Sequence, residues 1–266
     1  MKKVLKKIWD EFIYDGHLLG IGGVSILISF FLILNYKIDW CYLLIVYLGI
    51  ILVYSHDRKH TSVSKKPIFI IIASLFLILL SYFVYGTAPL FAVILLLLLG
   101  LGYGLIFKNI SKRVLAFKNF FVPLPYALLV LLYPVFINSK LNYCVILFTI
   151  FVYLRFFVAV SFYDIKDINE DKKEGMRTFA VLFTEKQLYL FLSLVNIISF
   201  SPLLVGIYLN YFRSYSLILL TLLLYSQMYF SLSKKSYSIH TLSYLFCDGE
   251  FVLWFPLVLA AKGIWR

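Results

Sequence analysis

The sequence predicts an all-α integral membrane protein with nine transmembrane helices. Hydrophobic residues make up 62% of the 266 residues, charged residues make up 14%, and the mean hydropathy is +0.93. Soluble domains are roughly half apolar and a quarter charged, so this composition excludes an ordinary soluble protein. The apolar residues also gather into runs of about 20, the length that a helix needs to cross a bilayer.

Nine such runs follow one another, at approximately 18–36, 40–55, 67–86, 88–107, 119–137, 142–163, 188–208, 215–232 and 243–263. The second run is short for a bilayer crossing, so its flanking residues must form part of the span. Residues 1–17 alternate lysines with apolar residues, which predicts an amphipathic interfacial helix, with a solvated basic tail as the alternative. They lack the unbroken apolar core of a cleavable signal peptide. We expect residues 18–266 to form a single transmembrane domain.

The basic residues predict the orientation in the membrane. Of the 25 Lys and Arg residues, 19 fall in the N-terminal segment and in the loops on its side, and five fall on the opposite side. Cytoplasmic loops carry such an excess, so we expect the N-terminus to be cytoplasmic and the C-terminus to lie outside. Attraction to anionic lipid headgroups accounts for the basic balance without a nucleic-acid partner.

Acidic residues concentrate where the sixth run ends. Asp164, Asp167 and Asp171 fall within an arc of about 60° on a helix. Three carboxylates in that arc repel one another unless a cation compensates them. Mg²⁺ is held by a few carboxylates and by phosphate oxygens of a substrate, so a magnesium site is one interpretation. The alternative is a solvated acidic helix balanced by its own basic residues, which are Lys166, Lys172, Lys173 and Arg177. Gly175 offers a stop for this helix.

The acidic segment and a basic loop resemble the UbiA prenyltransferase superfamily. Residues 164–182 read DIKDINEDKKEGMRTFAVL, which is similar to the family's second Asp-rich motif, D-x-x-D-x-x-x-D followed by Gly and then Arg/Lys-Thr. Residues 103–119 read YGLIFKNISKRVLAFKN, which is similar to the family's basic loop after helix four. The resemblance extends over most of the chain and implies a nine-helix UbiA-like bundle.

The first Asp-rich motif departs from the family pattern. The usual form is N-D-x-x-D-x-x-x-D, and residues 53–61 here read VYSHDRKHT. Asp57 is the one carboxylate of the three that is kept. Tyr54, Asp57 and Arg58 match a Y-x-x-D-R form found in some branches, but Thr61 stands where those branches commonly keep another Asp.

The resemblance implies an Mg²⁺-dependent enzyme in the membrane. Such an enzyme moves an isoprenyl group from a prenyl diphosphate to an aromatic or other lipid-forming acceptor. Asp164, Asp167 and Asp171 would hold one Mg²⁺, and Asp57 would contribute to another. The basic residues expected to contact the donor diphosphate are Lys118, Arg58, Lys112 and Arg177, of which Lys118 matches the family loop.

Other function classes explain the acidic cluster less well. A CDP-alcohol phosphotransferase needs a D-G-x-x-A-R sequence that the chain lacks, and a transporter is expected to place its charges near the midplane. A catalytically silent member that binds isoprenoid lipid remains the main alternative. Asp248 and Glu250, at the start of the ninth run, either line the cavity or sit near the interface.

Overall fold

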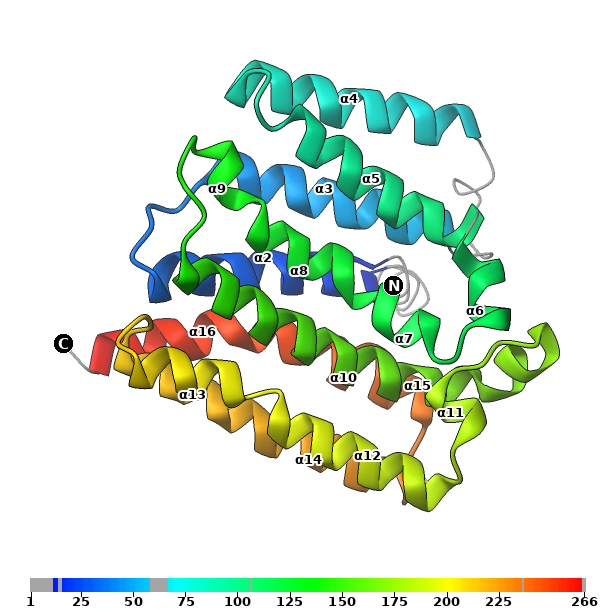
Figure 1. The fold of residues 1–266 in the computed structure, drawn as a ribbon. Coiled ribbons are helices and arrows are strands. Elements are labelled where there is room, and N and C mark those ends of the chain that lie inside the picture. The colour runs from blue at the N-terminus through cyan, green and yellow to red at the C-terminus, as the bar shows by residue number, and fades with distance from the viewer. Residues whose placement is uncertain (1–11, 14–15, 58–66, 106, 236, 265–266) are drawn as a thin grey trace, which may run out of the picture.

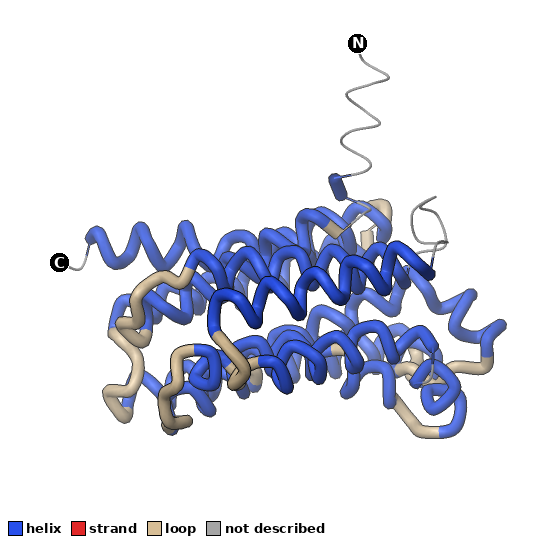
Figure 2. Tube along the Cα trace, turned by 90° about the horizontal axis from the view of Figure 1, so that it is seen from above, coloured by secondary structure: helices blue, strands red, loops and turns tan. Residues whose placement is uncertain are grey.

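The structure is a computed structural model that describes residues 12–13, 16–57, 67–105, 107–235 and 237–264. Every described segment of regular structure is helical (Figures 1 and 2), which confirms the all-α prediction. The helices are α2 (His17–Ile33), α3 (Trp40–Asp57), α4 (Pro67–Tyr85), α5 (Leu90–Leu105), η1 (Phe107–Asn109), α6 (Ile110–Arg113), α7 (Phe117–Phe121), α8 (Pro123–Leu131), α9 (Tyr133–Phe136), α10 (Tyr143–Glu174), α11 (Phe179–Leu182), α12 (Glu185–Ile198), α13 (Ser201–Tyr208), η2 (Ser214–Leu220), α14 (Thr221–Ser233), α15 (Ile239–Thr241), η3 (Leu242–Cys247) and α16 (Asp248–Ile264).

Within the described residues, six helical stretches are long and apolar enough to cross a membrane. They are α4, α7–α9, α10, α12–α13, η2–α14 and α15–α16. A seventh is possible if α5 and the following η1–α6, bent by 53°, count as one span, and α2 and α3 are shorter apolar helices. Each of the nine predicted runs therefore coincides with a helical segment, while nine crossings remain a prediction. The predicted amphipathic segment lies mostly outside the described residues.

Helix α10 runs through the middle of the bundle (Figure 1), and it packs against α8 on one side and against α12 and α13 on another. Helices α2 and α16 come from opposite ends of the described chain and lie side by side. Their contact is the most extensive between any two described helices. Helix α4 lies at the edge and packs chiefly against α3 and α5. The central position of α10 brings the predicted acidic motif into contact with several other segments.

Both ends of α10 are defined by capping residues. The Asn142 side chain accepts a hydrogen bond of 3.0 Å from the Val145 amide at the first turn, as expected of an N-cap asparagine. Gly175 ends the helix with φ 73°, in the left-handed region that glycine adopts without strain. The predicted stop at Gly175 is thus confirmed. A helix of 32 residues is about 48 Å long, so its last turns extend past a hydrocarbon core of about 30 Å.

Candidate active site

A cavity of about 850 Å³ lies between α3, α5, α8 and α10, and its wall is completed by η3 and α16. Most of its lining is apolar and aromatic. At the end formed by the last turns of α10, the lining becomes charged, and the charged side chains there are Lys108, Lys118, Asp164, Lys166, Asp167, Glu170, Asp171 and Glu174. The cavity therefore combines a long apolar part with one ionic end.

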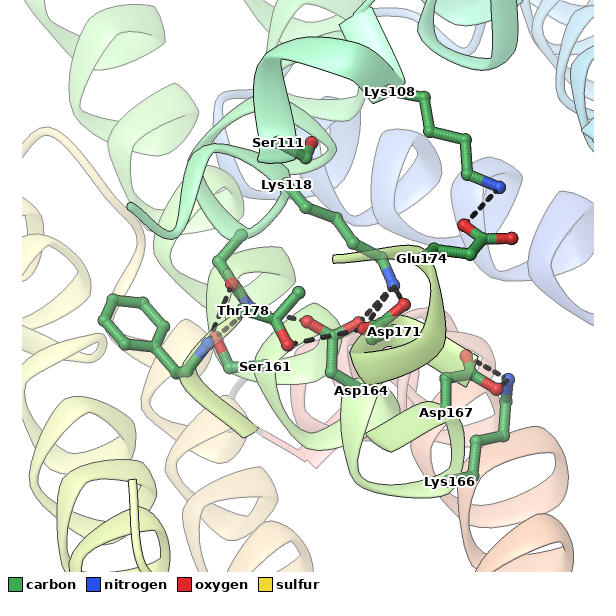
Figure 3. A network of polar contacts seen from close by, with 12 residues as sticks. Lys108, Ser111, Lys118, Ser161, Asp164, Lys166, Asp167, Asp171, Glu174 and Thr178 are labelled. Atoms are coloured by element: carbon green, nitrogen blue, oxygen red, sulfur yellow. Dashed lines mark hydrogen bonds and ion pairs between the residues drawn. The ribbon is translucent and has the colours of Figure 1, made fainter. Parts of the chain in front are cut away.

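Two of the predicted acids share one ammonium group at this end (Figure 3). The Nζ atom of Lys118 lies 2.7 Å from Asp164 Oδ1 and 3.3 Å from Asp171 Oδ2. The side chains of Lys118, Asp164 and Asp171 are 17%, 2% and 5% exposed. Because so little water reaches them, the ammonium group is the main compensation for the two carboxylates.

Neutral side chains fix the orientation of the two carboxylates. Asn119 Nδ2 donates to Asp164 Oδ2 at 2.9 Å, and Thr178 Oγ1 donates to Asp171 Oδ2 at 3.3 Å. The Phe179 amide in turn donates to Asn119 Oδ1 at 3.4 Å. Sequence reasoning assigned no role to Asn119. The available signal was its position directly after Lys118, on the short helix α7.

The basic loop is joined to the segment after α10 by backbone hydrogen bonds. The Ala116 amide donates to the Arg177 carbonyl at 2.7 Å, and the Arg177 amide donates to the Ser111 carbonyl at 3.1 Å. Ala116 has φ 52°, a left-handed conformation that is costly for a residue with a Cβ. These contacts turn the chain just before α7 and thereby direct Lys118 towards α10.

Asp167 does not join the other two acids. Its carboxylate lies 2.6 Å from the Nζ atom of the adjacent Lys166, and Figure 3 shows this pair apart from the Lys118 group. The Lys166 ammonium also lies 4.4 Å from the ring centroid of Tyr163 and 5.1 Å from that of Tyr244. Sequence reasoning treated Lys166 only as a compensating charge, since nothing in the sequence indicated the two rings.

The other predicted diphosphate ligands have different surroundings. Lys112 and Arg177, both of which the structure describes, are exposed and lie outside the cavity lining. Arg177 Nη1 donates to the Arg113 carbonyl at 3.4 Å. The side chain of Asp57 and the whole of Arg58 lie outside the described residues. Tyr54, one turn before Asp57, has its hydroxyl 3.2 Å from that of Tyr163, so the end of α3 borders the site.

Asp248 and Glu250, for which the sequence left two interpretations, face different surroundings. Asp248 lines the cavity. Glu250 is buried and forms an ion pair with Arg155 of α10, away from the cavity lining. Cys41, Cys144 and Cys247 are free thiols.

The fit of a magnesium ion to these residues is partial. Within the described part of the chain, no three His, Cys, Asp or Glu side chains gather closely enough to hold a metal ion. Asp164 and Asp171 do converge on a single cationic position, because one ammonium reaches both carboxylates. One or two carboxylates completed by phosphate oxygens suffice for Mg²⁺, so this pair fits the ion if a phosphate substrate supplies the remaining ligands.

The arrangement suits an amphipathic anion. Lys118 provides a nearly buried positive charge at the ionic end, and the apolar part of the cavity can enclose a hydrocarbon tail. A fixed cation in a water-poor site stabilises negative charge more strongly than it would in water. The geometry therefore supports holding a phosphate or diphosphate beside α10 while its tail extends between α3, α5 and α8.

Comparisons with known proteins agree with the fold and with the family resemblance. A model of the UbiA prenyltransferase family matches residues 59–247. One solved structure, described as digeranylgeranylglyceryl phosphate synthase, is similar with a TM-score of 0.61 and 17% identity, covering 99% of this chain and 98% of that one. The apo structure of a UbiA homologue from Aeropyrum pernix K1 is similar with a TM-score of 0.61 and 12% identity, covering 95% and 96%. No curated protein sequence matched the chain. The chain, an integral membrane protein, therefore belongs to the UbiA prenyltransferase family.

Proposed function

We propose that this protein is an intramembrane prenyltransferase. It moves an isoprenyl group from a prenyl diphosphate to an aromatic or other lipid-forming acceptor, and it depends on Mg²⁺. The observation that carries this proposal is the single cavity that joins a long apolar part to the Lys118, Asp164 and Asp171 group. Family membership supports prenyl transfer as the class of reaction.

Lys118 is the proposed diphosphate ligand. As the allylic carbon–oxygen bond breaks, its electrons leave with the diphosphate, and the ammonium group faces the oxygen on which negative charge grows. When bound, Mg²⁺ would add positive charge at the same oxygens and so favour departure of the diphosphate. Asp164 and Asp171 are its proposed ligands, with Asp167 and Asp57 as further ones. Arg58, Lys112 and Arg177 remain proposed contributors to diphosphate binding.

The acceptor completes the reaction. Its nucleophilic carbon or oxygen forms a bond to the isoprenyl carbon and loses a proton, so that the products are the prenylated acceptor, diphosphate and a proton. Tyrosine and phenylalanine rings along the cavity stabilise the allylic cation through their faces. We propose that residues 18–266 act as one unit, because helices from α2 to α16 contribute to this lining.

We also propose nine membrane crossings, with the N-terminus and both Asp-rich loops cytoplasmic and the C-terminus outside. The charge asymmetry and the nine apolar helical segments support this orientation. With the native cysteines replaced, Glu185→Cys should resist an impermeant thiol reagent in intact cells, and Tyr211→Cys should react. Labelling of Glu185→Cys alone would reverse the orientation.

The activity is tested with purified protein in detergent or bilayers. Radiolabelled prenyl diphosphates are supplied with Mg²⁺ and a panel of aromatic and lipid acceptors, and we expect a labelled lipid product that a chelator abolishes. A protein that binds isoprenoids with or without Mg²⁺, yet transfers none of the donors to any acceptor, would support the silent lipid-binding alternative instead.

A further inference from the structure

The apolar part of the cavity extends along α3 away from the ionic group. On α3 its lining begins at Tyr42, the third residue of the helix, and continues to Tyr54, beside the ionic end. Twelve helical residues correspond to about 18 Å. Leu77, Val93 and Phe136 also line the cavity, and Phe136 packs against Tyr42.

The tyrosine at this end is held from two directions. Its hydroxyl donates to the carbonyl of Leu129, in the last turn of α8, where helix carbonyls lose their partners in the next turn. Its backbone amide donates to Asp39 Oδ1 at 3.0 Å. Tyr42 is fully buried, and swinging its ring away would leave the Leu129 carbonyl without this donor.

Phe136 completes the end wall and is held in turn. Its ring centroid lies 4.7 Å from that of Tyr42, with the ring planes 62° apart. Behind it, the Tyr85 ring packs edge-on with a centroid distance of 5.3 Å, and the Tyr85 hydroxyl donates to Asp39 Oδ1 at 2.6 Å. The Asp39 carboxylate thus holds Tyr42 directly, and it holds Phe136 indirectly through the Tyr85 ring.

We propose that Tyr42 and Phe136 form a rigid floor that sets the longest isoprenyl tail the protein accepts. This inference rests on the proposed prenyl-diphosphate substrate. A tail outside the cavity already lies in hydrocarbon, so the protein gains little from enclosing additional tail carbons. Selection by length must therefore come from steric exclusion. Tyr42 is held by hydrogen bonds and Phe136 by ring packing, so this pair yields less readily than flexible aliphatic side chains.

Variants at the floor test the proposal in both directions. With geranyl, farnesyl, geranylgeranyl and longer prenyl diphosphates, Tyr42→Ala and Phe136→Ala should raise kcat/KM for the donor one unit longer than the parent's optimum by about tenfold relative to that optimum. Val93→Phe, which adds bulk to the cavity lining in the first turn of α5, should shift the optimum to a shorter donor. Phe91→Ala is the matched control, because that ring is 73% exposed and outside the lining.

A binding measurement separates this inference from the proposed activity. The same donors should raise the melting temperature of the protein without any acceptor, since a ligand that binds the folded state stabilises it. A floor-dependent length optimum in melting temperature, without turnover, would uphold the floor and reject the enzyme. Turnover with a length profile that none of the three floor variants changes would reject the floor and uphold the enzyme. A parent that shows no length preference in either assay also overturns the floor, and melting curves without ligand show whether each variant is folded.

Discussion

Helix α10 carries two charged groups that differ in their access to the cavity. Arg155 and Asp164 are nine residues apart, which places them on opposite faces of the helix. Asp164 faces the cavity and shares Lys118 with Asp171. Arg155 is 1% exposed and faces α12, α14 and α16.

The Arg155 group is sealed among helices. The guanidinium group forms an ion pair with Glu250 and bonds to Asn196, and it donates to Ser226 Oγ at 2.7 Å. The other carboxylate oxygen of Glu250 accepts from the Ser226 hydroxyl at 2.8 Å and from the Tyr229 hydroxyl at 3.0 Å. Four helices therefore meet at a single ion pair that the protein itself surrounds.

The two groups differ in whether a ligand can replace one of their bonding partners. In lipid, helices gain little from the hydrophobic effect, so polar bonds and close packing determine how they associate. The Arg155 group supplies such bonds, and neither Arg155 nor Glu250 lines the cavity described above. Lys118 and its two carboxylates border the cavity, so a phosphate or a cation can take the place of either partner. We therefore propose that the first group serves helix packing and the second serves ligand binding.

Removing the buried cation should give the largest effect. Arg155→Met leaves Glu250 buried without its positive partner, and breaking such a pair typically costs about 3 to 5 kcal/mol of stability. We expect a large fall in melting temperature and in the yield of folded protein, measured in detergent by a thermal-shift assay.

The double variant Arg155→Met with Glu250→Gln sharpens this test, because it removes both charges. It should recover most of the lost melting temperature. Prenyl transfer per folded molecule should stay near that of the parent. A selective loss of transfer in the stable double variant would contradict the assignment of this group to packing.

Removing one carboxylate of the cavity group should change activity far more than stability. In Asp164→Asn the amide keeps the shape of the side chain but attracts a cation weakly. We expect kcat/KM to fall by about 100-fold, or about 2.7 kcal/mol. The melting temperature should stay within a few degrees, because Lys118 retains Asp171. Glu185→Gln, at an exposed acid on α12, is the control and should leave both quantities unchanged.

Removing the shared ammonium should separate phosphate binding from cation binding. Lys118→Ala should weaken donor binding by about 1.5 to 3 kcal/mol, seen as a higher KM. It should also raise the affinity of the apoprotein for Mn²⁺, because Asp164 and Asp171 lose their compensating charge. Lys140→Ala, at an exposed lysine on the opposite side, should change neither. Unchanged donor and Mn²⁺ affinities in Lys118→Ala would remove the proposed role.

The elements that sequence predicted well are those governed by local chemistry. Apolar runs and polar breaks located the nine apolar helical segments, although not short helices such as α6 and α11. Gly175 marked the end of α10, because its left-handed conformation favours glycine. The motif spacing also brought Asp164 and Asp171 to one face of the helix, where both reach Lys118. The helix count is less determined by sequence, since α2 and α3 are short for a bilayer and the α5 segment is bent.

Partners distant in sequence could not be predicted. The helical period places a Cβ atom on a face, but it does not choose among the rotamers of a long side chain. Asp167 accordingly shares the predicted face and yet pairs with its neighbour Lys166. Arg155 and Glu250 are separated by 95 residues, and only the packing of α16 beside α10 brings them together.

The pairing of Asp167 gives the smallest expected effect and the finest distinction between the two kinds of charged group. Lys166 resembles Arg155 in being held over aromatic rings, but it lines the cavity. Lys166→Met should free Asp167 to turn towards Asp164 and Asp171, which should raise Mn²⁺ affinity severalfold and lower kcat with little change in donor KM. Its cost in stability should be about 1 kcal/mol, the scale of one cation–π contact.

Lys166→Arg should restore parental values, because a guanidinium can pair with Asp167 over the same rings. Lys173→Met, at an exposed lysine on the same helix, is the control. A fall in melting temperature as large as that of Arg155→Met, without a change in Mn²⁺ affinity, would place Lys166 with the packing group instead.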